Sequence, residues 1–274
     1  MAMKRAALAL LLVVGAMFLL AWGAPAYGGS HPISAAEATP TVEPTPTVEP
    51  TRTVPVNPAW MKRYWGHRVH RVRTTRRVVA LTFDDGPNSR TKQAVRILDS
   101  YGAKGTFFAT GDMSRHRGMA AANRYVLKRG HELANHTMHH QRLDKSYAAN
   151  VKAIMDLEKL LIAQTGKKTR WVRAMGGDVT LTGLRATRKT GHLYAQWSLA
   201  VGDSVLGYTP PSRLYHNIVD HVRPGSIILM HVTHPETLAA LPSIVRELKR
   251  RGYKMVTLSQ MAAMGKPYPS WYVR

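Results

Sequence analysis

Cysteine is absent from this chain of 274 residues, which excludes disulfide bonds and thiolate metal ligands. Any metal ion must therefore be held by nitrogen and oxygen atoms. Acidic residues are also scarce, because 16 Asp and Glu stand against 39 Lys and Arg and the net charge is +23. A protein with this imbalance is expected to gather near polyanions, which include anionic polymers, lipid headgroups and nucleic acid.

The apolar run at the N-terminus is short for a membrane span. Lys4 and Arg5 precede apolar residues 6–22, and small residues follow as far as Ala26. This layout predicts a signal peptide over residues 1–26, and hence an exported protein. The alternative is an uncleaved anchor that tethers the chain to a membrane, although such a span ordinarily takes about 20 apolar residues.

A Thr/Pro-rich segment follows, and it contains the unit Thr-Pro-Thr-Val-Glu-Pro twice. Prolines at this density remove the amide donors that helices and sheets need, so residues 27–59 are expected to form an extended linker. The folded part is then a single domain of residues 60–274, which carries the whole excess of positive charge.

Short runs of β-branched and aromatic residues alternate with longer helical patterns in this domain. Strands are expected at residues 78–83, 105–109, 132–134, 171–173, 193–197, 226–230 and 254–257. The clearest helices are expected at residues 145–166 and 235–252, where apolar residues recur at helical spacing. About seven strand–helix units predict an α/β fold, namely a distorted (β/α) barrel with parallel strands, and a doubly wound sheet is the alternative.

Two adjacent aspartates, Asp84 and Asp85, follow the first of these strands in the sequence "TFDDGP". Neighbouring carboxylates repel each other, and at the end of a buried strand the ionised pair is costly unless a cation or a proton is shared. A helix cap or a turn is the simpler explanation of either aspartate taken alone.

Histidines follow two further strands. His136 and His140 are four residues apart, so a helical turn would place both imidazoles on one face. Two histidines and one carboxylate form a common site for zinc or another first-row divalent ion. His139 is an alternative ligand, and His231 follows the strand expected at residues 226–230.

The sequence "TFDDGP" and the later "KGTFFATGDM" and "GHELANHTMHH" together resemble the NodB-like polysaccharide deacetylases, carbohydrate esterase family 4. The resemblance extends over residues 78–261. It implies a single catalytic domain that uses one divalent metal ion to remove N-acetyl, and in some members O-acetyl, groups from glycans. Zinc is the expected ion, with cobalt, nickel and manganese as alternatives.

The resemblance also implies a role for each residue that matches a family motif. These are the general base Asp84, the arginine that orients it, Arg173, the general acid His231, its supporting aspartate Asp203, and the metal ligands Asp85, His136 and His140. His234 is an alternative acid, although its place at an expected helix start favours a solvated role.

The third family motif departs from its usual form of arginine, any residue, proline and an aromatic. This chain reads "RAMG", with Met175 and Gly176 at the last two positions. In the family, the amide of the last position donates to the oxyanion. Gly176 keeps that amide, but a loop without proline is freer and holds the donor less firmly. The sequence "WSLA" before Asp203, and Val232 after the acid, are more similar to the branch of muramic-acid deacetylases.

We therefore expect an exported deacetylase of an N-acetylated envelope or extracellular polysaccharide. Peptidoglycan is the first substrate to test, and chitin-like chains, exopolysaccharide and O-acetylated glycans follow. Anionic cell-wall polymers are a further expected partner because of the positive charge. The rival hypothesis is a glycan-binding protein that keeps the barrel and the metal but has lost turnover through the altered third motif. Specific binding of nucleic acid, which only the charge favours, ranks last.

Overall fold

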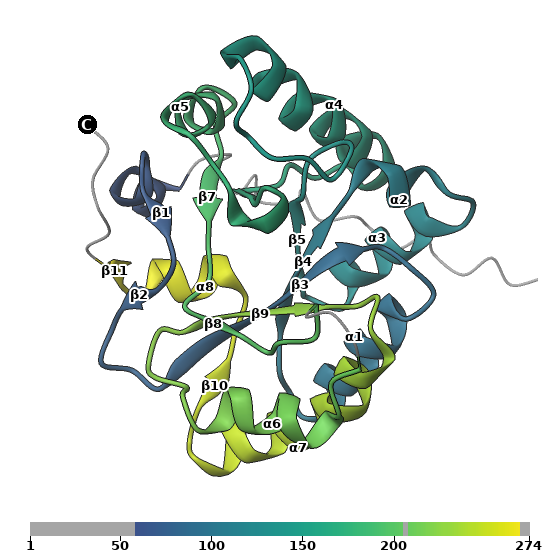
Figure 1. Cartoon of the computed structure of the whole chain (residues 1–274), viewed down its shortest axis with the longest axis vertical. Coiled ribbons are helices and arrows are strands. Elements are labelled where there is room, and N and C mark those ends of the chain that lie inside the picture. Colours follow the sequence, from purple (N-terminus) through teal and green to yellow (C-terminus); the bar gives the residue numbers. More distant parts are fainter. Residues whose placement is uncertain (1–57, 205–207, 269–274) are drawn as a thin grey trace, which may run out of the picture. The chain divides into compact units, whose positions relative to one another are not determined.

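The computed structural model describes residues 58–204 and 208–268 (Figure 1). The signal peptide or anchor expected at residues 1–26, and residues 27–57 of the expected linker, lie outside the described residues. Within the described ranges, no helix is both long enough and apolar enough to cross a membrane.

The core of the fold is a curled sheet of nine parallel strands. Across the sheet, the strands run in the order β1 (Arg68–Val69), β7 (Leu193–Ala195), β6 (Trp171–Val172), β5 (Glu132–Asn135), β4 (Gly105–Ala109), β3 (Val78–Gly86), β9 (Ile227–His231) and β8 (Leu199–Ala200). β10 (Lys254–Met255) also pairs with β3. Because β1 and β8 are the two ends of this path, the barrel is open, and the predicted distorted (β/α) barrel is confirmed.

Most helices cover the outside of the sheet (Figure 1), whereas α8 (Leu258–Ala263) packs against its inner face, where Leu258 lies in one core cluster with Val78 and Trp171. The other helices are α1 (Thr91–Ser100), α2 (Gly111–Arg115), α3 (Met119–Lys128), α4 (Tyr147–Thr165), α5 (Leu181–Lys189), α6 (Pro211–Val219) and α7 (Pro235–Arg250), with 3-10 turns η1 (Ala59–Tyr64) and η2 (Met175–Gly177). A separate antiparallel pair is formed by β2 (Val72–Arg73) and β11 (Lys266–Pro267).

The longest helix, α4, has the ends that its sequence predicts. The Ser146 hydroxyl accepts a hydrogen bond from the Ala149 amide at the start, and Gly166 takes a left-handed conformation with φ 67° at the end. Between these caps, Ile154, Leu157 and other apolar side chains recur at helical spacing and are buried. The helix expected at residues 145–166 is therefore confirmed to within two residues at its start.

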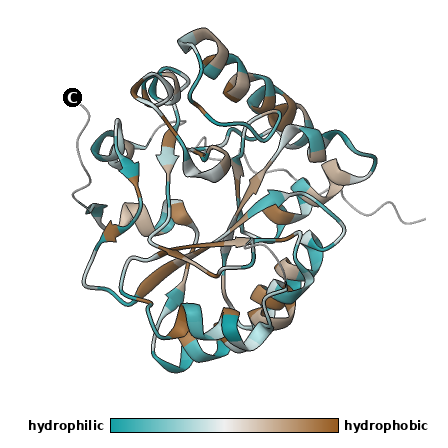
Figure 2. Cartoon of the chain, viewed as in Figure 1, coloured by the Kyte–Doolittle hydropathy of each residue, from teal (hydrophilic) through white to brown (hydrophobic). Residues whose placement is uncertain are grey.

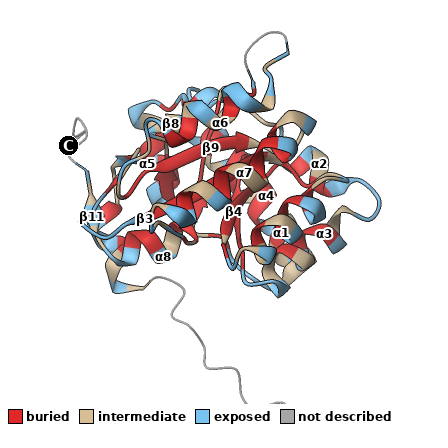
Figure 3. Cartoon of the chain, turned by 90° about the horizontal axis from the view of Figure 1, so that it is seen from below, coloured by how far each residue is buried: buried red, intermediate tan, exposed pale blue. Residues whose placement is uncertain are grey.

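The strands carry the apolar core, as the brown strands of Figure 2 and the red strands of Figure 3 show. Phe83 of β3 stacks on Phe107 of β4 with ring centroids 4.9 Å apart. On the other side of the sheet, Trp171 is fully buried, and its indole N–H donates to the Ser259 hydroxyl at 3.0 Å. Burial of both sheet faces explains why β3 reads as a continuous apolar run before its two aspartates.

The strand expected at residues 193–197 is interrupted in the structure. β7 ends at Ala195, and β8 begins at Leu199. Between them the Gln196 amide still donates to Val69 of β1, whereas the Ser198 amide donates to Ile227 of β9. The chain therefore leaves one edge of the open barrel and joins the other, and residue periodicity does not reveal this change of neighbour.

Candidate active site

Polar side chains from four strands converge at one end of the barrel. Asp84 and Asp85 lie at the end of β3, and His231 ends β9 in direct register with Asp84. His136 follows β5 immediately, and Arg173 follows β6. The C-terminal ends of parallel strands meet at the same edge, so groups distant in the sequence become neighbours here.

Asp85, His136 and His140 form a cluster of three metal-ligating side chains. The Nε2 atoms of His136 and His140 lie 3.4 Å and 3.1 Å from the Asp85 Oδ1 atom. One ligand atom from each residue lies within 4.8 Å of the other two. Zinc takes nitrogen and oxygen ligands at about 2.0–2.2 Å, so three such atoms fit around one ion. The donor set therefore suits a divalent metal.

The two histidines reach this cluster through a turn rather than a helix. The expected helical turn is therefore wrong in its local geometry. The Asn135 side chain accepts a hydrogen bond from the Thr137 amide at 2.9 Å, and Thr137 has a positive φ of 66°. The His140 φ is also positive, at 45°. The Asn135 side chain thus takes the Thr137 amide that a helix would pair with its own backbone. The resulting turn is not helical, but it still directs the His136 and His140 rings toward Asp85.

A backbone contact orients His136 within the cluster. Its Nδ1 atom lies 2.8 Å from the carbonyl oxygen of Arg173, which leaves Nε2 for the ligand position. His139, the alternative ligand, lies elsewhere. Its ring contacts Asp112 at 2.9 Å, and its side chain is 59% exposed. The structure therefore places His140, and not His139, beside His136 and Asp85.

Asp84 belongs to a second unit, in which a buried arginine fixes one carboxylate oxygen. Arg173 is fully buried, and its Nη1 atom donates to Asp84 Oδ1 at 2.7 Å and to the Thr82 hydroxyl at 2.9 Å. Its guanidinium also stacks over the Phe108 ring, with the Cζ atom 4.1 Å from the ring centroid. The other oxygen, Asp84 Oδ2, lies 3.5 Å from His136 Nε2 and so faces the metal cluster.

His231, at the end of β9, and Asp203, in the turn after β8, form a third unit. Asp203 Oδ1 lies 2.8 Å from His231 Nδ1, while Oδ2 accepts hydrogen bonds from the His231 amide at 2.7 Å and the Thr237 hydroxyl at 2.6 Å. Burial lowers the pKa of His231, but the hydrogen bond and the charge of Asp203 outweigh it and raise that pKa. His234 is the residue before α7, with its ring centroid 5.9 Å from that of His231.

The charges of the cluster act on Asp85. Burial would raise its pKa, but the hydrogen bond from His136 and the nearby charges of His136, His140 and His231 lower it to about 2. Burial and the neighbouring His136 lower the pKa of His140. A carboxylate and a neutral imidazole are the protonation states that bind a metal ion.

The altered third motif forms a glycine-dependent turn. Gly176 is exposed with φ 63°, and Gly177 has φ 73°. A side chain at Gly176 would be strained at this φ, and a Cβ at Gly177 would meet the Trp197 ring at 2.7 Å. The backbone after Arg173 therefore follows a path that requires glycine at both positions. Gly176 lies three residues beyond Arg173, and its amide is the candidate oxyanion donor.

Sequence reasoning missed three groups that support the site. Thr82 and the Gln196 carbonyl both accept from Arg173, and Thr237 donates to Asp203. Thr82 stands within the quoted "TFDDGP" but carries no chemistry of its own. Gln196 and Thr237 have no signal in the sequence, because their positions depend on where β7 ends and where α7 packs.

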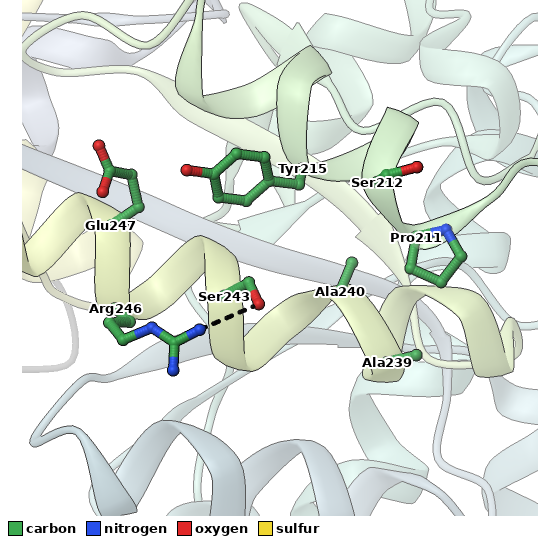
Figure 4. Close-up of a pocket in the computed structure, with 8 residues that line it drawn as sticks. All are labelled: Pro211, Ser212, Tyr215, Ala239, Ala240, Ser243, Arg246 and Glu247. Carbon is green, nitrogen blue, oxygen red and sulfur yellow. Dashed lines mark hydrogen bonds between the residues drawn. The ribbon is translucent and has the colours of Figure 1, made fainter.

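A separate surface pocket of about 310 Å³ lies between α6 and α7 (Figure 4). Tyr215, Ser243 and Arg246 contribute to its walls, and none of the residues described above lines it. The candidate active site is therefore distinct from this pocket.

Sequence comparisons connect the chain to known proteins. A family profile described as "Polysaccharide deacetylase" matches residues 71–195. A peptidoglycan-N-acetylglucosamine deacetylase of Bacillus cereus is 30% identical over 208 residues, which cover 72% of this chain and 93% of that protein. A peptidoglycan-N-acetylmuramic acid deacetylase of Bacillus subtilis is 25% identical over 192 residues, which cover 69% of this chain and 72% of that protein.

Solved structures show the same fold. A family 4 acetyl xylan esterase from Clostridium thermocellum, in complex with a cobalt ion, has a TM-score of 0.63 and 29% identity over 68% of this chain and 91% of that chain. A carbohydrate esterase family 4 pseudoenzyme from Bacillus anthracis has a TM-score of 0.68 at 20% identity, over 73% of this chain and 70% of that chain. At this identity, the second likeness concerns the fold alone.

Proposed function

The chain belongs to the polysaccharide deacetylases, carbohydrate esterase family 4, and we propose that it hydrolyses N-acetyl groups of an envelope polysaccharide with one divalent metal ion. The observation that carries the proposal is the convergence of three units at one end of the barrel. They are Asp84 with Arg173, the cluster of Asp85, His136 and His140, and His231 with Asp203. A protein that only binds glycans needs neither a base nor an acid.

The metal ligands in this proposal are Asp85, His136 and His140. Their nitrogen and oxygen atoms suit zinc, and cobalt, nickel and manganese are alternatives. When bound, the ion would polarise the acetyl carbonyl and lower the pKa of a water molecule beside it.

Asp84 is the general base of this mechanism. Arg173 holds one of its oxygens and leaves the other facing the ligand cluster, where it takes a proton from the attacking water. The water oxygen forms a bond to the acetyl carbon as the proton leaves. The Gly176 amide is the proposed donor to the oxyanion that develops on the acetyl group.

His231 is the general acid. Its Nδ1 atom is held by Asp203, so Nε2 is the atom that donates a proton to the leaving nitrogen when the carbon–nitrogen bond breaks. The products are acetate and a free amine on the sugar. Asp203 raises the pKa of His231 and thereby keeps the proton available at higher pH.

Peptidoglycan is the favoured substrate. Both curated relatives described above carry peptidoglycan in their names, and the basic domain suits an anionic wall. The sequence around Asp203 favours the muramic-acid branch. Chitin-like chains, exopolysaccharide and O-acetylated glycans are the alternatives. We place the enzyme outside the cytoplasm, in or near the envelope, because of the leader and linker expected at residues 1–59.

Acetate release tests this function directly. The purified protein is stripped of metal with a chelator, reloaded with zinc, cobalt, nickel or manganese, and incubated with peptidoglycan, chitin oligomers and acetylated xylan in parallel. We expect release from peptidoglycan that disappears on stripping and returns on reloading. Binding of one metal equivalent without release from any substrate would instead favour the glycan-binding alternative, and the glycine-rich third motif would be its cause.

Thr237 is predicted to position the acid through Asp203. Its hydroxyl is buried and donates to Asp203 Oδ2, so Thr237→Val leaves a buried carboxylate oxygen short of one donor. We expect kcat to fall about tenfold with little change in KM, since substrate contacts remain. Thr237→Ser restores the hydroxyl and should restore kcat. Equal losses in both variants would show that the side chain matters only for packing.

A further inference from the structure

Basic side chains gather at the end of the barrel opposite the candidate active site. Residues 71–83, 221–231 and 248–268 contain ten Lys and Arg and no Asp or Glu. These segments lead into or include the N-terminal ends of β3, β9 and β10. Asp84 lies six residues beyond the start of β3, which is about 20 Å along an extended strand.

Backbone contacts bring the three segments together. The Arg77 guanidinium donates to the Arg251 carbonyl at 2.7 Å, and the Lys254 amide donates to the Arg77 carbonyl at 2.8 Å. The Val72 amide donates to the Gly225 carbonyl at 2.9 Å, which places β2 against the turn before β9. We call this surface the basic face, and its exposed members are Arg73, Arg76, Arg77, Arg223, Lys249, Arg250, Lys254 and Lys266.

The charge of the basic face is mostly unbalanced. Glu247 pairs with Arg250 and Arg251 at its edge. Arg73, Arg76, Arg223, Lys254 and Lys266 form no ion pair with an acidic side chain of the described ranges. Like charges that lie close together repel each other and reduce stability, whereas a bound polyanion would neutralise them.

The pairing of β2 with β11 brings two of these unbalanced cations together. Lys266 stands directly opposite Arg73 on these two strands, which lie side by side in Figure 1, and both side chains are exposed. Two cations in register on a two-stranded sheet repel each other. A negatively charged group bound between them would convert this repulsion into attraction.

We propose that the basic face binds an extended phosphodiester polymer, as a docking site distinct from the active site. Most of its exposed cations are arginines, whose planar guanidinium matches phosphate oxygens with two parallel hydrogen bonds. A lipid surface fits less well, because such sites combine cations with an exposed apolar face. Met264 and Tyr268 are the exposed large apolar side chains of these segments. The Arg71 guanidinium already stacks over the Tyr268 ring, with its Cζ atom 5.0 Å from the ring centroid.

Docking at this end leaves the catalytic end of the barrel free. A polymer bound across the starts of β3 and β10 would hold the enzyme in an anionic wall while Asp84 and His231 face the glycan. Only the choice of the cell wall as the place of binding rests on the proposed function. Binding to the polymer is measurable without turnover, so the two proposals fail separately.

The test compares two variants with the same change in net charge. The first replaces four exposed cations of the basic face by glutamine: Arg73→Gln, Arg76→Gln, Arg223→Gln and Lys254→Gln. The control replaces four exposed cations of the helices α1, α4 and α5: Arg96→Gln, Lys159→Gln, Arg185→Gln and Lys189→Gln. Each protein is titrated against poly(glycerol phosphate), phosphatidylglycerol vesicles and double-stranded DNA at several salt concentrations.

We expect the basic-face variant to bind poly(glycerol phosphate) at least about tenfold more weakly, and its plot of log affinity against log salt to be shallower by about 3. The control variant should stay within about threefold of the unmodified protein, and both should release acetate from soluble peptidoglycan fragments at the same rate. Equal weakening in both variants would overturn the assignment to this face. Tighter binding to vesicles or DNA than to the polymer would overturn the choice of partner.

Discussion

Asp84→Asn is expected to lower kcat about a thousandfold while the protein still binds its metal ion, because the change removes the base and leaves all three proposed ligands. Asp85→Asn is expected to lose the metal ion as well, since Asp85 Oδ1 is the oxygen to which both histidines point. Metal content by elemental analysis and acetate release, measured on the same preparations, check both results.

Two controls make this comparison decisive. Asp112→Asn removes an exposed carboxylate that contacts His139 outside the cluster, so metal content and activity should both persist. Asp84→Asn leaves the buried Arg173 guanidinium without a charged partner and will lower the free energy of unfolding by up to about 3 kcal/mol, which thermal unfolding measures. Equal metal content in the Asp84 and Asp85 variants would contradict the roles assigned to them.

His231→Ala is expected to lower kcat by about a hundredfold to a thousandfold, while His234→Ala should change it by less than about threefold. The reason is that Asp203 contacts His231, and His234 occupies the exit from β9 at the start of α7. Steady-state kinetics on the preferred glycan distinguish the two. The opposite order would identify His234 as the acid.

The pH dependence of kcat provides a second readout for the same unit. A general acid works in its protonated form, so activity falls as the pH rises through the pKa of His231. Asp203 raises that pKa, and Asp203→Asn should therefore shift the alkaline limb to lower pH. An unchanged alkaline limb with a normal fold would mean that His231 does not supply the proton.

The expected strands show which parts of this fold the local sequence pattern predicts. The runs at residues 78–83 and 105–109 correspond to β3 and β4, because strands buried on both faces need continuous apolar sequence. The run at residues 193–197 contains no local sign that its hydrogen-bond partner changes from β1 to β9. The neighbour of a strand is a long-range choice, so periodicity predicts that a strand exists and not where it ends.

Some residues of the candidate site are recognisable in the sequence, and others are found only in the structure. Its chemically distinctive members, the paired aspartates and the spaced histidines, are visible in the sequence because such residue types are costly to bury without a purpose. Thr82 and Thr237 are visible only in the structure, since a buried hydroxyl acquires its role from the carboxylate or guanidinium that happens to lie within reach. Residue type alone does not reveal such a partner.

The choice between His139 and His140 is the clearest case of a question that sequence leaves open. Spacing permits either as the partner of His136, but Asn135 and Thr137 close a non-helical turn that sends His139 to Asp112 and His140 to Asp85. The sequence by itself determined the α/β fold, the absence of thiolate ligands and the excess of positive charge. The tertiary structure alone decided which side chains meet, and that the cations gather at the end of the barrel away from the aspartates, because strand order and turn geometry depend on contacts between distant residues.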